Sequence, residues 1–469
     1  MRERQKHQCC ECAELQKILE EKNKEIVQLK NEKIILEYEL KEMRDKWFSK
    51  KKKKKEKNAE VEAEDENNDA PPKKLGAPPG HPGWYRKTPD HIDETEEVEL
   101  CQCPHCGGKD LGECSEIEEH IQEDIVLPRV KVTKYRRHYY WCYNCKKKVS
   151  GKGQEEIPKS YIGPQAKAVA AFLKYVVKVS TRDIQKIFKE LCGLTIVPSS
   201  IPGFNNQARI KCAPLYDAIL DKIKQALYLH ADETGCPVNG KNWWDWIFVT
   251  SKLCLHLVHH SRGQQVVEEV LGKKYDGILL SDFLSAYNKI ETKAKQRCLV
   301  HLLRDLKKIL ECTDPEDAQY RYCQRLKHVI QQAIELSEKY KAAEVSDQQF
   351  AEQKQQIKES IKDFLYPDPQ KSHLTRLAKR LNRHQDELFT FLDYPGIPYH
   401  NNFAERMIRP SVLLRKITFG LRSDNGILNH SVLMSVLQTG RLNAKNSIKL
   451  IKHTFTSRDK PTLDLCHGP

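Results

Sequence analysis

The chain has 469 residues, too many for one compact hydrophobic core, so roughly two to four domains are expected. Its 79 lysines and arginines exceed its 65 aspartates and glutamates, which gives a formal net charge of +14. This surplus favours a polyanionic partner such as nucleic acid, although a basic protein without such a partner has the same charge. No apolar run approaches the ~18 residues that cross a membrane, and the charged N-terminus has no signal core. We therefore expect no membrane association and residence in the cytoplasm.

Residues 12–48 carry a heptad repeat that predicts a coiled coil. Eight of its ten a and d positions are apolar. The a positions are Leu19, Ile26, Lys33, Leu40 and Trp47, and the d positions are Leu15, Lys22, Leu29, Leu36 and Met43. A partner helix would bury this seam, so we expect a homodimer or a higher oligomer. The alternative is a single charged helix that lies on its own protein.

Residues 49–95 have the composition of a disordered linker. Residues 50–55 are all lysine, and the polar, acidic and proline-rich segment after them leads to GAPPGHPGW. Like charges repel along a chain, and few apolar residues are present to form a core. We expect a basic, proline-rich linker whose lysines are either solvated or in contact with phosphates.

Residues 96–155 contain two C-x-x-C pairs that predict a zinc ribbon. The pairs are Cys103 with Cys106 in CPHC and Cys142 with Cys145 in CYNC. Four thiolates form a closed tetrahedral site, so one structural Zn²⁺ is expected. A thioredoxin-like redox pair would instead need one C-x-x-C beside a βαβ unit. Disulfides are not expected to explain the 17 cysteines of a cytoplasmic chain.

The aromatic segment YRRHYYWC before the second cysteine pair predicts a β-hairpin arm. Arg136 and Arg137 on this arm are candidates for contacts with the DNA backbone. Two further sets of potential metal ligands are Cys101 with His105, and the N-terminal group His7, Cys9, Cys10 and Cys12.

Residues 160–222 are expected to be helical and to contain a helix-turn-helix that binds DNA. Thr181 is placed to cap the first helix, and Cys192-Gly193 ends it. Pro198 then opens a second short helix, whose first residues Ser199 and Ser200 are candidates for DNA contact. The apolar face of the first helix is predicted to be Ile184, Ile187, Phe188 and Leu191. Two packed helices of an ordinary protein core can show the same sequence pattern, and this alternative stays open.

From residue 225 onward, short apolar runs alternate with helical segments. YLHADET, NWWDWIFVTS and KLCLHLVHH predict three strands, with the tryptophans in the sheet core rather than wedged into DNA. The helix SRGQQVVEEVLG, the strand GILLSDF, a helix and the short strand QRCLVHLL follow. This is the order of a ribonuclease H-like sheet, in which the first and fourth strands are neighbours. Asp232 and Asp282, each at a predicted strand end, would then meet near one edge.

A third acid completes a potential metal site in this domain. Two close carboxylates repel each other in a protein interior, so a divalent cation is their expected neighbour. Two Mg²⁺ or Mn²⁺ ions about 4 Å apart need oxygen ligands from two or three acids. In HNNFAERMIRP, Glu405 lies one turn into a helix that opens at Asn401. Arg406 and Arg409 are candidates for contacts with substrate phosphates, or Arg406 pairs with a nearby acid. In the alternative interpretation, the aspartates are turn residues and Glu405 is a surface acid.

Cys298 and His301 form a C-x-x-H motif just after the fifth predicted strand. Core packing with a hydrogen bond is the simpler interpretation of this pair. The alternative is a substrate-facing His301, with Arg304 one turn further on. Residues from about 303 to 392 are charged and helical in pattern, which predicts a helical insertion within a domain at 225–455, before a tail at 456–469. The expected architecture is a multidomain α/β protein with a coiled coil, a zinc ribbon, a helical region and a mixed sheet.

Four stretches of the chain together resemble the prokaryotic insertion-sequence transposases of family sixty-six. They are YLHADETGCPVNGKNWWDWIF, GILLSDFLSAYN, QRCLVHLLRDLKK and HNNFAERMIRPSVLLRKITFGLRS. The zipper region, the PGHPG stretch and the four-cysteine segment are similar to the same family, so the resemblance covers most of the chain. This chain has His400 where much of the family has an aspartate before the two asparagines.

The resemblance implies a DDE transposase with a ribonuclease H-like core, in which Asp232, Asp282 and Glu405 are the catalytic acids. It implies a helical insertion between the second and third acids, a place at the prokaryotic nucleoid, and DNA as partner at both element ends and target. Accessory proteins from the same element are a further expected class of partner. The reaction would be metal-dependent strand cleavage followed by transfer of the freed 3′ ends, by in-line displacement at phosphorus.

Two other functions stay open from the residues. A non-catalytic DNA-binding regulator would use the zipper and the helix-turn-helix and would not nick DNA. A ribonuclease H-like nuclease or resolvase would cut DNA without joining it. The three acids in motif context argue against the regulator, whereas only a strand-transfer assay with precut ends separates the transposase from the nuclease or resolvase.

Overall fold

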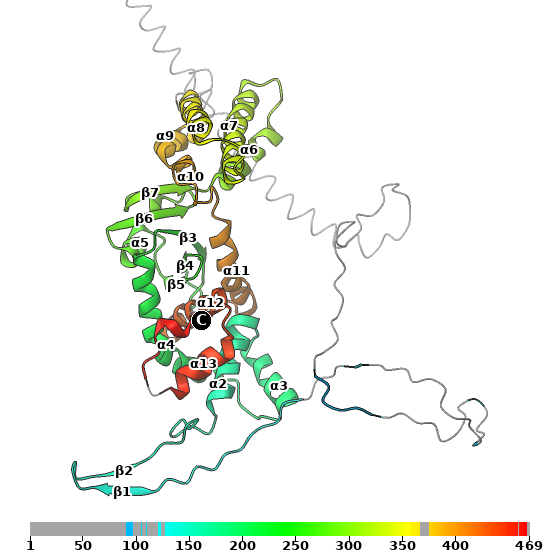
Figure 1. Cartoon of the computed structure of the whole chain (residues 1–469), viewed down its shortest axis with the longest axis vertical. Helices are drawn as coiled ribbons and strands as arrows, with labels where there is room; N and C mark the ends of the chain where they lie inside the picture. Colours follow the sequence, from blue (N-terminus) through cyan, green and yellow to red (C-terminus); the bar gives the residue numbers. More distant parts are fainter. Residues whose placement is uncertain are drawn as a thin grey trace, which may run out of the picture. The chain divides into compact units, whose positions relative to one another are not determined.

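The computed structural model describes residues 91–96, 105, 109, 121–122, 127–365, 375–457 and 459–466. They fall into two units, one up to Pro128 and one from Arg129 onward, and the two are described separately. The described residues up to Pro128 contain no helix or strand, so every helix and strand named below belongs to the larger unit (Figure 1). Several predictions lie outside the described residues: the coiled coil, the linker up to residue 90, the N-terminal group His7, Cys9, Cys10 and Cys12, and Cys101, Cys103 and Cys106.

A β-hairpin forms around the second cysteine pair, as predicted. β1 (Tyr139–Cys142) pairs antiparallel with β2 (Lys147–Ser150), and Cys142 is opposite Lys147. The turn between them contains Cys145 and passes through a left-handed residue, Lys146, with φ 49°. The second C-x-x-C pair is therefore held in the tight bend that a zinc knuckle requires.

Helices follow the hairpin, but their details differ from the prediction. The N-cap of α3 (Thr181–Cys192) is Ser180 rather than Thr181, because the Ser180 hydroxyl accepts the Asp183 backbone N–H at 3.2 Å. On the predicted apolar face, Leu191 is 49% exposed. The other helical elements here are α2 (Pro164–Phe172), η1 (Leu173–Val177) and α4 (Ser200–Lys224).

The second helix of the predicted helix-turn-helix is not short. α4 begins at Ser200 as predicted, but it continues for 25 residues. Its first turns, with Ile201 and Phe204, pack against α3, whereas the stretch from Ala208 to Ile223 joins the core of the sheet. α4 is thus shared between a small helical cluster and the main domain. DNA binding by these helices stays a prediction.

One mixed sheet of five strands forms the centre of the unit, with the order β5-β4-β3-β6-β7. The three strands β3, β4 and β5 are antiparallel, and β6 and β7 continue the sheet parallel to β3. The first and fourth strands are neighbours, as predicted. The bounds are β3 (Tyr228–Gly235), β4 (Trp244–Val249), β5 (Cys254–His259), β6 (Lys274–Ser281) and β7 (Glu291–Arg297), with α5 (Gln264–Leu271) between β5 and β6.

The predicted fifth strand was misplaced. The sequence ETKAKQR forms β7, and most of the predicted strand QRCLVHLL belongs to α6 (Leu299–Cys312). β7 is an edge strand with polar side chains, so it lacks an apolar signal. Leu299, Leu302 and Leu306 are buried at helical spacing instead. The helix expected between the last two strands is only the short 3-10 turn η2 (Ser285–Tyr287).

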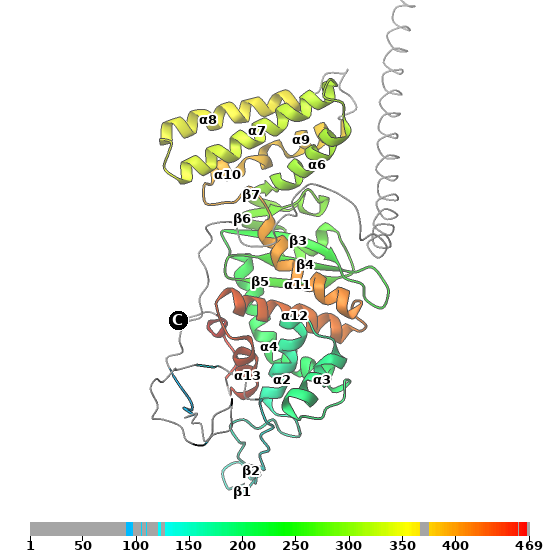
Figure 2. The same cartoon turned by 90° about the vertical axis from the view of Figure 1, so that its right-hand side faces the viewer.

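Helices cover both faces of the sheet (Figure 2). On one face Trp246 and Phe248 of β4 join the main core with α4 and α5, which confirms a core position for Trp246. Trp243 and Trp244 are half-buried. On the other face Ile247 packs against α11 (Asn402–Thr418). α12 (Asp424–Leu442) runs along β5 and α4, and α13 (Ser447–Thr456) contacts α2, before the final turn η5 (Leu463–Leu465).

The chain between β7 and α11 is helical, as predicted, and has its own hydrophobic core. Its elements after α6 are α7 (Ala318–Lys341), α8 (Asp347–Ser360), η3 (Ile361–Phe364), α9 (Thr375–Leu388) and α10 (Thr390–Asp393). α9 and α10 pack on β7, so this segment is attached to the sheet at its parallel edge. Among the helices described, none combines the length and apolar character that a membrane crossing needs.

Candidate active site

The parallel pairing of β3 and β6 brings two of the predicted acids together. Tyr228 is paired with Ile278 and His230 with Leu280, and the same register continued by two residues sets Asp232 opposite Asp282. Neighbouring strands lie about 4.8 Å apart. Asp282 directly follows β6, as predicted, whereas β3 continues past Asp232 to Gly235 because it still pairs there with β4.

The carboxyl group of Asp232 lies in an environment that disfavours its charge. Burial raises its pKa to about 8, and the neighbouring carboxylates of Glu233, Asp282 and Glu405 act in the same direction. Its Oδ1 accepts the Glu233 backbone N–H at 2.9 Å, and no described side chain donates a hydrogen bond to it. A group of this kind is stabilised as an anion only when a cation comes close.

Glu233 is the other acid of the pair, and both of its carboxylate oxygens already accept hydrogen bonds. Its Oε1 accepts from Arg262 at 2.7 and 3.1 Å, and its Oε2 accepts from the Tyr287 hydroxyl at 2.9 Å. Successive residues of a strand point to opposite faces of the sheet, so Glu233 and Asp232 face different surroundings. Asp232 is therefore the acid of the pair that remains available for a ligand.

Asp282 is held by its own loop and by Arg297 at the end of β7. Its Oδ1 accepts the Leu284 backbone N–H at 2.8 Å, and its carbonyl oxygen accepts from Arg297 at 2.8 Å. The fully buried Arg297 also pairs with Glu387 of α9 at 2.6 Å. The helical segment thereby supports the loop that carries Asp282. Sequence reasoning missed this role, because a polar edge strand offers no pattern that predicts a buried arginine.

Asn401, the N-cap residue of α11, fixes the start of that helix to β3 and α6. Its side chain contacts His230 Nδ1 at 3.0 Å and donates to the Ala231 carbonyl at 2.8 Å. Its backbone N–H donates to Cys298 Sγ at 3.2 Å, which confirms the core role predicted for Cys298. One turn later, Glu405 lies beside the strand that carries Asp232, and its charge acts on the Asp232 carboxyl.

The carboxylate of Glu405 is incompletely satisfied. Its Oε1 is buried without a hydrogen-bond partner, and lies 3.7 Å from His301 Nε2. Its Oε2 lies 3.6 Å from Arg304. Ligand atoms of Cys298, His301 and Glu405 are within 4.8 Å of one another. A free carboxylate oxygen next to the desolvated Asp232 is a donor set that suits a hard divalent cation.

At the hairpin, the second cysteine pair suits a metal as well. Hydrogen bonds from Cys145 lower the pKa of the Cys142 thiol, which favours the thiolate that binds zinc. The model for the zinc-finger binding domain of transposase IS66 matches residues 101–146, a range that contains both cysteine pairs. This match supports the predicted zinc ion.

A second family model, the transposase IS66 family, matches residues 159–428, which is more than half of the chain. The chain belongs to the IS66 family of transposases. The resemblance seen in the sequence is thereby confirmed. Among curated proteins, the chain is similar to the uncharacterized protein y4jO of Sinorhizobium fredii (strain NBRC 101917 / NGR234), with 36% identity over 66 residues. That match covers 14% of this chain and only 21% of the relative.

The remaining predicted DNA contacts of this IS66 family member lie on α11, at the start of α4 and before β1. Arg406 and Arg409 are exposed on α11. Arg406 lies over the Phe403 ring at 5.8 Å and forms no ion pair among the described residues, so its contact with a substrate phosphate stays a prediction. Ser199 is exposed and Ser200 half-buried at the start of α4, and Arg136 is exposed before β1. Arg137 is not free, because its guanidinium is bound by Glu156.

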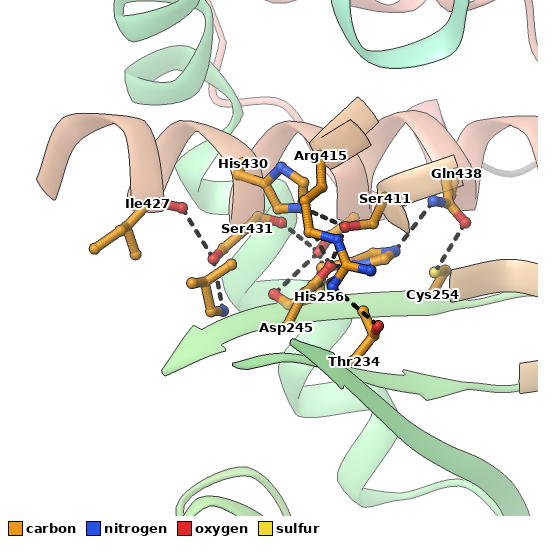
Figure 3. Close-up of polar contacts among 12 residues, drawn as sticks. Thr234, Asp245, Cys254, His256, Ser411, Arg415, Ile427, His430, Ser431 and Gln438 are labelled. Atoms are coloured by element: carbon orange, nitrogen blue, oxygen red, sulfur yellow. Dashed lines mark hydrogen bonds and ion pairs between the residues drawn. The ribbon is translucent and has the colours of Figure 1, made fainter. Parts of the chain in front are cut away.

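Sequence reasoning missed a buried polar cluster that joins the sheet to α11 and α12 (Figure 3). Asp245 of β4 accepts from Ser411 of α11 and lies 3.1 Å from His256 Nδ1 and 3.2 Å from His430 Nε2. Burial opposes the charge of Asp245, but the two imidazoles outweigh it and lower its pKa. Burial likewise opposes a charged His256, yet Asp245 raises the pKa of this imidazole to about 10. The only signal in the sequence was a polar residue within each of two apolar strands, in WDWIF and LHLVHH.

Proposed function

We propose that this chain is a DDE transposase that binds the ends of its element, cleaves DNA strands and joins the freed 3′ ends to target DNA. Asp232, Asp282 and Glu405 are the proposed catalytic acids. The observation that carries this proposal is geometric: the parallel pairing of β3 with β6 and the start of α11 bring Asp282, which follows β6, and Glu405 close to Asp232. The strand order β5-β4-β3-β6-β7 supports a ribonuclease H-like core for this domain.

The residues of the site suit phosphoryl transfer with bound metal. Two Mg²⁺ or Mn²⁺ ions held by the three acids would activate the attacking water or 3′-hydroxyl and stabilise the leaving oxygen. Asp232 offers a carboxylate oxygen without a side-chain donor, and Glu405 offers a buried oxygen without a hydrogen-bond partner. His301 and Arg304 lie beside Glu405 and are half-exposed and exposed, so they are proposed to orient the substrate phosphate.

DNA binding is proposed to involve surfaces outside the acidic site. The exposed Arg406 and Arg409 extend along α11 from Glu405 and are placed to follow a DNA backbone. The zinc ribbon and the helices around α3 are proposed to bind the element ends. The predicted coiled coil is proposed to join two or more copies of the chain.

The test is strand cleavage and strand transfer by purified protein with element ends and Mg²⁺. Asp232→Asn is expected to reduce cleavage by more than about 100-fold. Mutation of a residue that only hydrogen-bonds to a metal ligand already lowers activity by up to about 100-fold, and loss of a ligand itself should cost more. Binding to the ends is expected to persist. Asp276→Asn is the matched control, since Asp276 is exposed at the start of β6.

Normal cleavage by Asp232→Asn would remove this residue from the site. Transfer assays with precut ends separate the proposed transposase from a nuclease or resolvase, which would cut but not join. Specific end binding with no Mg²⁺-dependent nicking by the unaltered protein would instead identify a DNA-binding regulator.

A further inference from the structure

A cavity of about 620 Å³ lies away from the three acids. It is formed by η1, the starts of α3, α4 and α12, and the end of α11, and none of the proposed catalytic residues lines it. Its volume is in the range of small-molecule sites, which is about 300–1,000 Å³. The residues that matter for its chemistry are Lys174, Arg182, Asn205, Phe419, Asn429 and His430, together with Arg422 at the mouth.

Three buried polar side chains in the cavity wall have unused hydrogen-bonding atoms. Both amide atoms of Asn205, Oδ1 of Asn429 and Nδ1 of His430 have no partner in the structure. These residues are only 1%, 5% and 3% exposed, respectively. Buried polar atoms are nearly always paired with protein or ordered water, so these atoms are open to water or to a ligand in the cavity.

Three basic side chains line the cavity: Lys174, Arg182 and Arg422. None of them forms an ion pair within the described part of the chain, and no acidic residue is among the residues that line the cavity. Lys174 is half-buried, and this burial lowers its pKa, whereas the two arginines are exposed. Basic side chains without ion pairs favour an anionic group, and a phosphate is the anion that arginine binds best.

An exposed aromatic side chain, Phe419, also lines the cavity. Phe419 is 83% exposed and has a left-handed backbone with φ 57°, followed by Gly420 with φ 97°. Phe419 is the C-cap residue of α11, a position at which helices commonly end in this conformation. An exposed ring at the lip of a polar cavity is suited to stack on a nucleic-acid base.

We propose that this cavity binds a nucleoside phosphate, with the base among Asn205, Asn429 and His430 and the phosphate at the three cations. Amide side chains pair with base edges because they offer a donor and an acceptor side by side. The ligand can be a free nucleotide or an unpaired nucleotide of a DNA strand, since both present the same groups. The free-nucleotide case does not depend on the proposed function.

His430 offers one free ring nitrogen to a ligand. Its Nε2 lies 3.2 Å from Asp245 Oδ2 and 3.0 Å from the Ser411 hydroxyl, so this nitrogen already has partners. Its Nδ1 has none, and Figure 3 shows it on the side of the ring that points away from Asp245.

The test uses the full chain and two kinds of probe. In the first, the four deoxynucleoside 5′-monophosphates are titrated by calorimetry, and at least one of them is expected to bind. In the second, a duplex with one unpaired adenosine is compared with the same duplex carrying an abasic residue at that position. Binding of the free monophosphates alone assigns the cavity to free nucleotides, and a preference for the base-containing duplex alone assigns it to DNA.

Substitutions locate the binding in this cavity. Asn205→Leu keeps the volume and removes two unpaired buried atoms, so the variant is expected to melt no lower than the unaltered protein. It is expected to weaken nucleotide binding, or the preference for the base over the abasic residue, by about tenfold or more. Arg422→Gln is expected to weaken binding of the phosphate-bearing probes similarly. Lys416→Gln is the control, because Lys416 is exposed on α11 and does not line the cavity.

The proposal is overturned if the unaltered protein neither binds any monophosphate nor distinguishes the base from the abasic residue. It is also overturned if Asn205→Leu folds and binds both probes as before. Should Asn205→Leu fail to fold, Asn429→Leu provides the same comparison from α12.

Discussion

At the scale of single residues, Asp232 and Glu233 show how the alternation of side chains along a strand gives two neighbouring carboxyl groups different surroundings. Glu233 has an arginine and a tyrosine as partners, while Asp232 has one backbone N–H. Burial raises the pKa of both carboxyls, and the partners Arg262 and Tyr287 lower only that of Glu233. The sequence could place an acidic pair at this strand, but it could not say which acid was free, because Arg262 and Tyr287 come from later segments.

The raised pKa of Asp232 predicts how stability depends on pH. Its carboxyl has an ordinary pKa of 3.8, against about 8 in the folded chain. Between these values the folded group stays protonated while the unfolded one ionises, so its cost to stability grows as pH rises and levels off above about pH 8. Asp232→Asn should therefore raise the melting temperature of Mg²⁺-free, zinc-retaining protein at pH 8.5, by on the order of 5 °C, and have little effect near pH 4.

A second test measures how Mg²⁺ changes the melting temperature. If Asp232 binds the cation, Mg²⁺ should raise the melting temperature of the unaltered protein at pH 8.5, and much less at pH 5, where protons compete for the carboxylate. Asp232→Asn should lose most of this response, and Asp276→Asn should keep it. An equal response to Mg²⁺ in all three proteins would place the ion elsewhere.

At the scale of elements, α12 acts as a cover for the edge strand β5. The hydroxyls of Ser431, Ser435 and Thr439 accept the backbone N–H groups of Val258, His256 and Cys254, at 3.1, 2.7 and 3.0 Å. Four residues of helix rise about 6 Å and two residues of strand about 6.6 Å, so the two series stay in step. This pairing satisfies an edge that would otherwise be open to another strand.

The Asp245 cluster ties the same helix to α11 and to the interior of the sheet. Asp245→Ala leaves buried histidines and Ser411 without their acceptor, so we expect a loss of about 3–5 kcal/mol in the free energy of unfolding. The raised pKa of His256 stabilises the fold below pH 6.5 and less as pH rises toward about 10, and the lowered pKa of Asp245 stabilises it above pH 3.8.

Denaturation across pH 4–10 therefore checks this role of Asp245. The difference in unfolding free energy between the unaltered protein and Asp245→Ala should be largest between about pH 4 and 6.5 and shrink at higher pH. Glu335→Gln, which breaks the exposed pair with Lys339, should change nothing measurable. A difference that stays constant with pH would show that the pair is not charged in the folded chain.

At the scale of the whole molecule, the sequence predicted the fold where each element has a pattern of its own. The first four strands, the hairpin and the helical segment before α11 were found because their apolar spacing is local. β7 and α6 were confused because an edge strand needs few apolar residues, and the apolar run beside it belonged to a helix. Arg297, Asn401 and the wall of the cavity could not be predicted, since each depends on contacts between residues about 90 to 255 positions apart.

The last prediction for the whole molecule is that the predicted coiled coil joins copies of the chain into an oligomer. Leu29 and Leu36 are consecutive d positions, whereas Asn31 faces outward in the same heptad numbering. Leu29→Glu with Leu36→Glu would put two charges into the seam, so light scattering should report monomers where the unaltered protein and Asn31→Glu form dimers or larger assemblies. Joining two element ends to one target needs two active sites held together, so the double variant should also lose paired-end strand transfer more than single-strand cleavage. If the double variant keeps the mass of the unaltered protein, the seam is not the oligomer interface and the helix lies on its own chain instead.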